Sequence, residues 1–200
     1  MIMIEGFKGV YSFDSDFFVG DYTEYLKTHS EFKDVKGVLI TSKERDEISF
    51  LHFHNKTRVK VACVNFEENP SFLKDEAGKT VKQCECFCVS EKDKGKAWFA
   101  LVELKYCKAA KENIINNFHA AIGQLEDSFI YLRDTKQMIE EKEYPYYWIV
   151  SMPEHTDQVP FTSFAMSQDE ILDYKDKYHA IIIGDTDIEI LNPGYIRGMN

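Results

Sequence analysis

Residues 81 to 107 decide the fold. They read Val81-Lys-Gln-Cys-Glu-Cys-Phe-Cys-Val-Ser90, then Glu91-Lys-Asp-Lys-Gly-Lys96, then Ala97-Trp-Phe-Ala-Leu-Val-Glu-Leu-Lys-Tyr-Cys107. The first and last segments are rich in apolar and aromatic residues and predict strands, and the polar segment between them predicts a turn. An antiparallel hairpin that turns near Lys94 sets Glu85 directly across from Glu103, with Cβ atoms about 5 Å apart.

The segment after this hairpin predicts a long helix over residues 109–135. Its apolar side chains recur at steps of three and four, which places them on one helical face: Ile115, Phe118, Ile122, Leu125, Phe129 and Leu132. Residues 145–152 then predict another strand, which Pro153 ends. The order strand, strand, helix, strand indicates a mixed α/β or α+β fold.

The flanking regions predict more strands and one short helix. Residues 1–66 are β-rich, with strands expected at 37–41, 47–53 and 58–64 and a short helix near Tyr22, and residues 67–80 and 154–166 are expected to be loops. Ser167 to Glu170 is a capping box before a short helix that ends near Tyr178, and a hairpin is expected from 179–183 and 188–191. We expect one domain over 1–200, with a β-rich part at 1–66, a core at 80–152 and a helix and hairpin at 153–200.

Composition excludes some classes of protein and favours a cytoplasmic one. The 200 residues are 44% hydrophobic and 29% charged, which is typical of globular chains, and no run of about 18 apolar residues predicts a membrane span. The apolar start from Met1 meets Glu5 at once, so no secretory signal is expected there. Five cysteines are an odd count, which favours free thiols in a cytoplasm.

Charge is distributed unevenly along the chain. The whole chain carries a net charge of -10, yet residues 56–111 hold twelve Lys or Arg and eight Asp or Glu. This basic segment allows contact with nucleic acid, whereas the acidic remainder argues against strong nonspecific binding. A solvated, lysine-rich surface explains the same pattern without a partner.

Glu103 and Lys105 set two charges into a strand that is otherwise apolar. The two-residue period of a strand puts both side chains on one face, and burying them without partners is costly. If Glu85 also stands opposite Glu103, a divalent metal would relieve the repulsion between the two carboxylates, and Mg²⁺ prefers such oxygen ligands. Lys105 could then hold an attacking water or stabilise charge in the transition state. A salt-bridge ladder is the alternative.

This stretch resembles the PD-(D/E)XK nuclease superfamily, also called restriction-endonuclease-like. Gln83-Cys-Glu85 is similar to its first acidic motif, Phe99-Ala-Leu-Val-Glu103-Leu-Lys105 to its acid-x-Lys motif, and Gln124 to the Gln on its following helix. The resemblance covers residues 80 to 152. Three departures are the use of Glu85 in place of the usual Asp, the lack of a preceding Pro, and the lack of a clear helical acid before the hairpin, for which Glu67 or Glu68 are candidates.

The resemblance implies a central four-stranded mixed sheet flanked by helices and hydrolysis of phosphodiester bonds of DNA or RNA with Mg²⁺ or Mn²⁺. It implies that Glu85, Glu103 and the Leu104 backbone carbonyl hold the metal, that Lys105 orients the water and that Gln124 supports the site. Two alternatives remain: a catalytically degenerate binding or interaction module with this fold, and an unrelated α+β scaffold.

Other residue patterns carry weaker hypotheses. Cys84, Cys86 and Cys88 alternate along a strand and favour buried apolar packing over zinc binding. His52 and His54 share a strand face but have no evident third metal ligand. Asp14, Asp16 and Asp21 are assigned to turns or caps. The aromatic run from Tyr144 to Trp148 is assigned to the core, and Cys107 is assigned as a thiol that is not activated.

Overall fold

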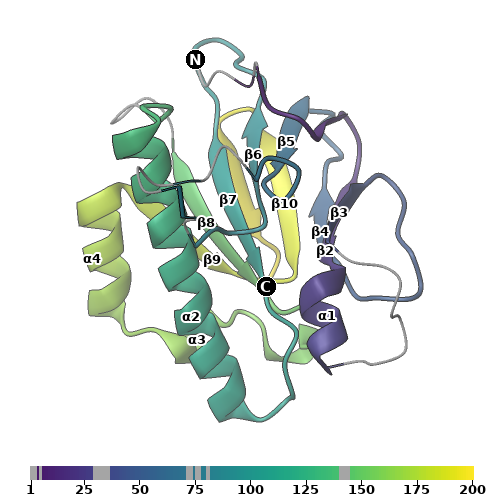
Figure 1. Cartoon of the computed structure of the whole chain (residues 1–200), viewed down its shortest axis with the longest axis vertical. Coiled ribbons are helices and arrows are strands. Elements are labelled where there is room, and N and C mark those ends of the chain that lie inside the picture. The colour runs from purple at the N-terminus through teal and green to yellow at the C-terminus, as the bar shows by residue number, and fades with distance from the viewer. Residues whose placement is uncertain are drawn as a thin grey trace.

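The computed structural model describes residues 4, 6–28, 37–70, 74, 78–79, 82–139 and 145–200. In this part of the chain, two mixed β-sheets pack face to face, and helices cover the outer face of the larger sheet (Figure 1). The mixed α and β class expected from the sequence is confirmed.

The larger sheet contains six strands in the order β1-β5-β6-β7-β8-β9. Neighbours from β1 to β7 are antiparallel, and β7, β8 and β9 are parallel. The strands are β1 (Val10–Phe13), β5 (Val61–Asn65), β6 (Cys86–Ser90), β7 (Phe99–Leu104), β8 (Tyr146–Ser151) and β9 (Ala180–Gly184).

The hairpin formed by β6 and β7 has the predicted register. Cys86 pairs with Val102 and Cys88 with Ala100, as a turn near Lys94 requires. Lys94 and Gly95 both have positive φ, at 47° and 82°, which suits a tight hairpin turn. The first strand is shorter than expected, because residues 82–85 are not part of the ladder and Val81 lies outside the described residues.

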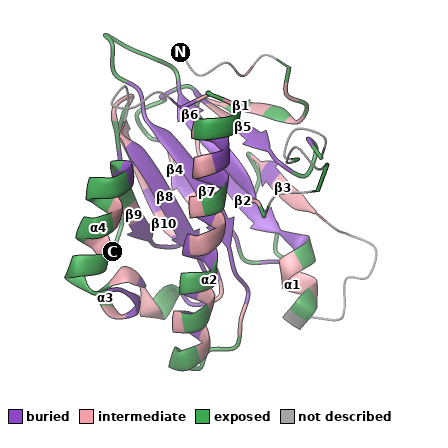
Figure 2. Cartoon of the chain, turned by 60° about the vertical axis from the view of Figure 1, so that its left-hand side comes forward, coloured by how far each residue is buried: buried purple, intermediate pink, exposed green. Residues whose placement is uncertain are grey.

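Helices cover one face of the larger sheet. The predicted long helix is α2 (Lys111–Ile130), which continues into a π-helical turn at Tyr131–Thr135. It buries Phe118, Ile122, Leu125 and Phe129 as expected, although Ile114 is buried where Ile115 was predicted. Figure 2 shows these helices with buried inner and exposed outer faces.

Two further helices follow β8. Residues 154–166 were expected to be loop, but they contain a 3₁₀ turn (Thr156–Gln158) and α3 (Thr162–Ala165). The capping box is confirmed, because Ser167 and Glu170 exchange hydrogen bonds at the start of α4 (Gln168–Tyr178). No helix in the described ranges is both long enough and apolar enough to cross a bilayer.

The resemblance implies a central four-stranded sheet flanked by helices, but the larger sheet has six strands and its second face is covered by a second sheet and not by helices. Its order is β11-β10-β4-β2-β3, and aromatic and branched side chains fill the core between the sheets. Its elements are β2 (Phe17–Asp21), β3 (Val38–Thr41), β4 (Leu51–His54), β10 (Asp187–Asn192) and β11 (Tyr195–Gly198), with α1 (Tyr22–Thr28) after β2. The expected helix near Tyr22 is therefore confirmed.

The hairpin expected between residues 179–183 and 188–191 is wrong. β9 pairs with β8 in the larger sheet, whereas β10 pairs with β4 and β11 in the smaller one. Asp185 Oδ1 accepts the backbone N–H groups of Thr186 and Asp187 at 2.7 and 3.2 Å, which stabilises the crossing between the sheets. A short polar segment between two apolar runs does not distinguish such a crossing from a hairpin turn.

Candidate functional site

Glu103 and Lys105 form an ion pair at the end of β7. Lys105 Nζ donates to Glu103 Oε1 at 2.5 Å, and the two residues are 7% and 0% exposed. The Lys105 backbone N–H donates to Ser151 O at 2.9 Å, which extends the parallel pairing with β8 by one residue. The lysine is therefore fixed by its backbone as well as by its ammonium group.

Glu85 lies directly before β6 and is held from both sides. Its backbone N–H donates to Val102 O at 2.9 Å, and its carbonyl accepts the Phe66 N–H at 3.1 Å. Its exposed fraction is 9%. Glu85 and Glu103 are thus brought together on neighbouring strands, but in the interior and not in an open cleft.

The electrostatics of this cluster are dominated by burial. Burial, and then the Glu103 charge, raise the pKa of Glu85 well above its usual value. Burial also raises the pKa of Glu103 to about 8, against the opposing effect of Lys105. The pKa of Lys105 is raised, because the Glu103 carboxylate outweighs the effect of burial. Burial therefore favours the neutral forms of Glu85 and Glu103, whereas the charged form of Lys105 is favoured.

Asp21 is an acidic neighbour that sequence reasoning assigned only to a turn or cap. It ends β2, is 2% exposed, and its Oδ1 accepts the Thr23 N–H at 2.7 Å, so the capping role at α1 is correct. Its charge also raises the pKa of both Glu85 and Glu103. No local signal could have joined residues so far apart in the chain. We call Asp21, Glu85, Glu103 and Lys105 the carboxylate–lysine cluster.

Gln124 contacts the segment that leads into Glu85. Its Nε2 donates from α2 to Gln83 O at 3.1 Å, which fixes the backbone two residues before the glutamate. Gln124 can therefore position Glu85 through the chain.

The acids proposed as a helical ligand before the hairpin lie in a turn. Glu67 accepts the Val38 N–H at 2.9 Å, and Glu68 accepts the Tyr11 hydroxyl at 2.6 Å. Glu24 on α1 also acts on the cluster, because its charge raises the pKa of Glu103 and of Lys105.

Two acidic side chains of the cluster offer the kind of oxygen ligand that Mg²⁺ or Mn²⁺ prefers. Glu103 Oε2 is buried and has no hydrogen-bond partner among the described residues. A carboxylate oxygen in this state is costly unless a cation binds it. Glu85 and Glu103 supply hard oxygen ligands, and the backbone carbonyl of Leu104 follows between Glu103 and Lys105. The residues present therefore fit Mg²⁺ or Mn²⁺.

The basic segment does not gather into one surface. Lys92, Lys94 and Lys96 lie at the hairpin turn, at the far end of the strands from Glu103, whereas Lys82 and Lys108 are exposed, three residues before Glu85 and three residues after Lys105. Their place in the chain makes Lys82 and Lys108 candidates for a phosphate contact there.

The cysteine and aromatic patterns, where the structure describes them, belong to the packed core. Cys84, Cys86 and Cys88 are buried free thiols. Of the aromatic run, residues 146 to 148 are at most 1% exposed and belong to the core, while Tyr144 lies outside the described residues. These side chains do not offer a surface on which bases could stack.

Cys107 has a histidine neighbour that the sequence did not reveal. Its Sγ lies 3.6 Å from His155 Nε2, but that nitrogen is 2.7 Å from the Cys107 carbonyl oxygen. Burial and the Glu154 charge raise the pKa of the Cys107 thiol. The pair is therefore not an activated nucleophile.

His52 and His54 gain the third ligand that was not evident from the sequence. Asp16, assigned only to a turn, offers a carboxylate oxygen near both rings, and one ligand atom from each residue lies within 4.8 Å of the others. Asp187 contacts the opposite side of both rings. We call Asp16, His52, His54 and Asp187 the histidine cluster.

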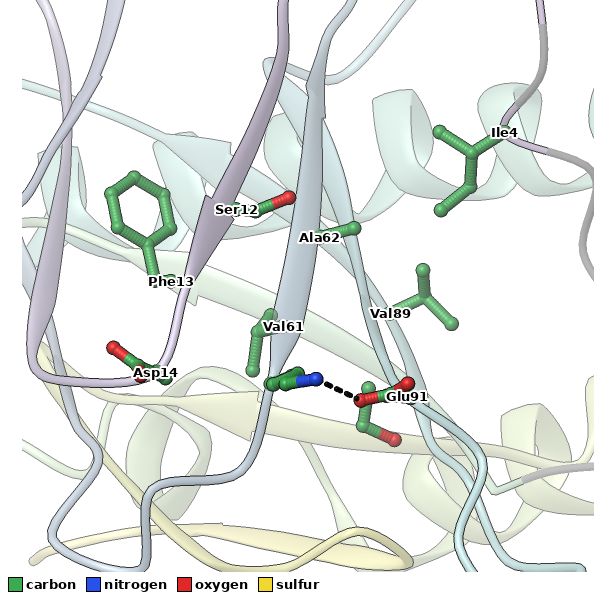
Figure 3. A pocket seen from close by; sticks show the side chains of 10 residues that line it. Ile4, Ser12, Phe13, Asp14, Val61, Ala62, Val89 and Glu91 are labelled. Atoms are coloured by element: carbon green, nitrogen blue, oxygen red, sulfur yellow. Dashed lines mark ion pairs between the residues drawn. The ribbon is translucent and has the colours of Figure 1, made fainter.

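A separate hollow of about 500 Å³ opens at β1, β5 and β6 (Figure 3). Phe13, Ala62 and Val89 give it a largely apolar wall, and Lys60 and Glu91 form an ion pair of 3.4 Å at its rim. None of the residues of the carboxylate–lysine cluster lines this hollow.

Comparison with known proteins gives no relative for this chain: no protein-family model, no curated protein and no solved structure matches it.

Proposed function

We propose that this protein hydrolyses phosphodiester bonds of DNA or RNA at the carboxylate–lysine cluster, with Mg²⁺ or Mn²⁺ as cofactor. The observation that carries the proposal is the buried, unpartnered Glu103 Oε2 beside Glu85 and Lys105. In the metal-free chain these carboxylates have Lys105 as their nearby cation, and a divalent ion would complete the compensation of charge. All five cysteines are free thiols, which supports a reducing, cytoplasmic setting.

The chain's own groups account for the steps of such a hydrolysis. Glu85, Glu103 and the Leu104 carbonyl would hold the ion, which supplies Lewis-acid activation of the phosphate and a more acidic water. The Lys105 ammonium would orient the water that attacks phosphorus and meet the charge that develops on the phosphoryl oxygens. One P–O bond forms to the water oxygen, which gives a proton to solvent, and another P–O bond breaks as the leaving oxygen takes a proton from solvent, with no change of oxidation state.

The order of elements supports the resemblance to PD-(D/E)XK nucleases. β5, β6 and β7 form an antiparallel meander, and α2 connects β7 to the parallel strand β8. Glu85 precedes β6, and Glu103 and Lys105 end β7. Gln124 from α2 holds the chain before Glu85, in keeping with the supporting role that the resemblance assigns to it.

The test is cleavage of single- and double-stranded DNA and RNA at low salt, with Mg²⁺ or Mn²⁺. Glu85→Gln is the most informative variant, because Gln is isosteric with the protonated Glu85 and keeps the metal-free fold while removing a metal ligand. We expect cleavage by the natural chain and none by Glu85→Gln or by Lys105→Ala, whose fold is checked by circular dichroism. Glu91→Gln, at the far end of the same hairpin, should cleave normally.

A second candidate function is a nucleic-acid-binding module that keeps this arrangement but cuts nothing. The near-complete burial of Glu85, Glu103 and Lys105 favours it, because a phosphate must reach the metal. Binding of nucleic acid without cleavage, with either metal, would support this module. Cleavage that survives Glu85→Gln would contradict both candidates for the role of this cluster.

A further inference from the structure

We propose that Asp16, His52 and His54 bind a first-row divalent transition metal ion of the zinc class, with Asp187 as an outer carboxylate that orients His54 and faces His52. This site lies on the smaller sheet and does not depend on the function proposed for the carboxylate–lysine cluster.

The fold brings these residues together from three parts of the chain. His52 and His54 are two residues apart on β4, so their side chains lie on the same face of the sheet. β4 lies between β2 and β10. Asp16 directly precedes β2, and Asp187 opens β10, where it pairs with His52.

The three inner ligands are close to the geometry that zinc requires. Asp16 Oδ2 lies 3.3 Å from His52 Nε2 and 4.0 Å from His54 Nδ1. Tetrahedral Zn²⁺ with bonds of about 2.0 Å separates its ligand atoms by about 3.3 Å. The first distance matches this value, and a small rotation of the His54 ring would bring the second to it.

Asp187 lies on the outer side of both rings and is within hydrogen-bond distance of one. Its Oδ1 lies 2.7 Å from His54 Nε2 and 3.8 Å from His52 Nδ1, which are the nitrogens that face away from Asp16. A carboxylate in this place accepts the outer N–H of His54 and directs the lone pair of its Nδ1 at the metal, while its charge faces the outer nitrogen of His52.

Further contacts hold Asp16 and His52 in place. The Asn55 N–H donates to Asp16 Oδ1 at 2.7 Å, which leaves Oδ2 facing the histidines. The Phe18 ring stacks on His52, with centroids 4.3 Å apart. The two histidine rings lie 3.7 Å apart, and one nitrogen of each lies within 4.8 Å of the other and of an Asp16 oxygen.

The ligand set selects the class of metal and leaves it accessible. Two imidazoles and one carboxylate suit Zn²⁺, Fe²⁺, Co²⁺ or Ni²⁺, whereas Mg²⁺ prefers an all-oxygen site. The side chains of His52, His54 and Asp16 are 25%, 20% and 43% exposed. His52 and Asp187 also line an open hollow of about 420 Å³, so an ion can enter. Three protein ligands leave a coordination position for water.

The experiment is a Zn²⁺ titration of the full chain by calorimetry after chelator treatment, followed by Co²⁺ absorption spectra. We expect one Zn²⁺ per chain, not displaced by excess Mg²⁺, and a Co²⁺ spectrum without thiolate bands. Asp16→Asn, His52→Gln and His54→Gln should each weaken binding at least about tenfold, and Asp187→Asn should weaken it about 10- to 100-fold. Asp14→Asn and His119→Gln, exposed residues of the same types outside the cluster, should bind zinc as the natural chain does.

Two results would overturn the site. One is the absence of stoichiometric zinc binding, which would make the cluster a set of ion pairs only. The other is binding that is unchanged in Asp16→Asn and His52→Gln but lost in Cys107→Ser, which would place the ion at Cys107 and His155. Asp16→Asn decides the matter if a histidine variant unfolds, because Asp16 is half-exposed and its loss leaves the core intact.

Discussion

The carboxylate–lysine cluster and the histidine cluster differ in how their charges are compensated. The first is at the end of β7 on the larger sheet, and its groups are almost fully buried around one ammonium group. The second is on the smaller sheet, half-exposed, and each histidine contacts a carboxylate on either side. Burial makes unpaired charge costly in the first cluster, whereas water screens the charges of the second.

The comparison also separates two classes of metal. Oxygen ligands with one unpartnered carboxylate oxygen match Mg²⁺ or Mn²⁺, and imidazoles with an outer carboxylate match Zn²⁺. The two clusters should therefore respond to different ions and to different substitutions. Each of the following predictions tests one side of this contrast against the other.

The largest effect is expected from Lys105→Ala. Above pH 8, where Glu103 is ionised, it leaves the Glu103 carboxylate without its buried cation, and breaking a buried ion pair costs about 3–5 kcal/mol of unfolding free energy. Arg197→Ala, which removes an exposed partner of Glu189 on the smaller sheet, should cost much less. Urea unfolding of both variants measures the difference. Equal losses of unfolding free energy would mean that the buried ion pair of the larger sheet contributes no more than the exposed one of the smaller sheet.

The next effect is stabilisation by metal. Mg²⁺ at a hundredfold excess over its Kd should stabilise the natural chain by about 2.7 kcal/mol, which corresponds to about 5–10 °C in Tm. Glu85→Gln should lose this response, and His54→Gln should retain it. Zn²⁺ should give the opposite pattern. A thermal scan with each ion is the measurement, and a Mg²⁺ response that follows His54 would break the assignment.

The pH dependence of the metal-free protein should reveal the buried acid. The pKa of Glu103 is about 8 in the fold and near 4.5 in the unfolded chain, so the native state holds an extra proton between these values. The unfolding free energy contributed by this group therefore falls as pH rises through that window, by about 1.4 kcal/mol per pH unit. The raised pKa of Glu85 acts in the same direction.

Glu85→Gln removes one of these protons, so its stability should fall less steeply with pH than that of the natural chain. Guanidinium unfolding at several pH values between 5 and 8, without divalent ions, provides the two slopes. Glu91→Gln, which changes an exposed acid at the far end of the same hairpin, serves as the comparison and should retain the steep slope. Parallel curves for Glu85→Gln and the natural chain would mean that Glu85 is ionised in the fold.

The smallest effect concerns nucleic-acid binding. Lys108 is exposed three residues after Lys105, and Lys94 is at the far end of the same hairpin. Lys108→Gln should weaken binding to DNA and lower the slope of log K against log salt by about 1, since one phosphate contact is lost. Lys94→Gln should change neither quantity. A larger effect at Lys94 would move the binding surface to the hairpin turn.

The sequence predicted those parts of the fold that depend on neighbouring residues. Alternation around Lys94 was enough to set the register of β6 and β7, and the spacing of Phe118, Ile122 and Leu125 was enough to predict α2. The capping box of Ser167 and Glu170 is local in the same sense. Each pattern lies within one element or one turn.

The features that the sequence did not predict involve residues far apart in the chain. His52 and Asp16 are 36 residues apart, and His54 and Asp187 are 133 apart, so no spacing rule could join them. The second sheet was not predicted for the same reason, because its paired strands β4 and β10 are far apart in the sequence. The carboxylate–lysine cluster could be predicted in part from the sequence only because Glu85, Glu103 and Lys105 belong to a single hairpin.

The most direct test of the proposed site is to locate a bound Mn²⁺ ion. Crystals of the full chain grown with MnCl₂ would reveal the ion by its anomalous scattering. The account predicts one Mn²⁺ coordinated by Glu85, Glu103 and the Leu104 carbonyl, with Lys105 beside it and no Mn²⁺ there in the Glu85→Gln variant. Crystals with Mn²⁺ only at Asp16, His52 and His54, or with none between Glu85 and Glu103 at saturating metal, would contradict it.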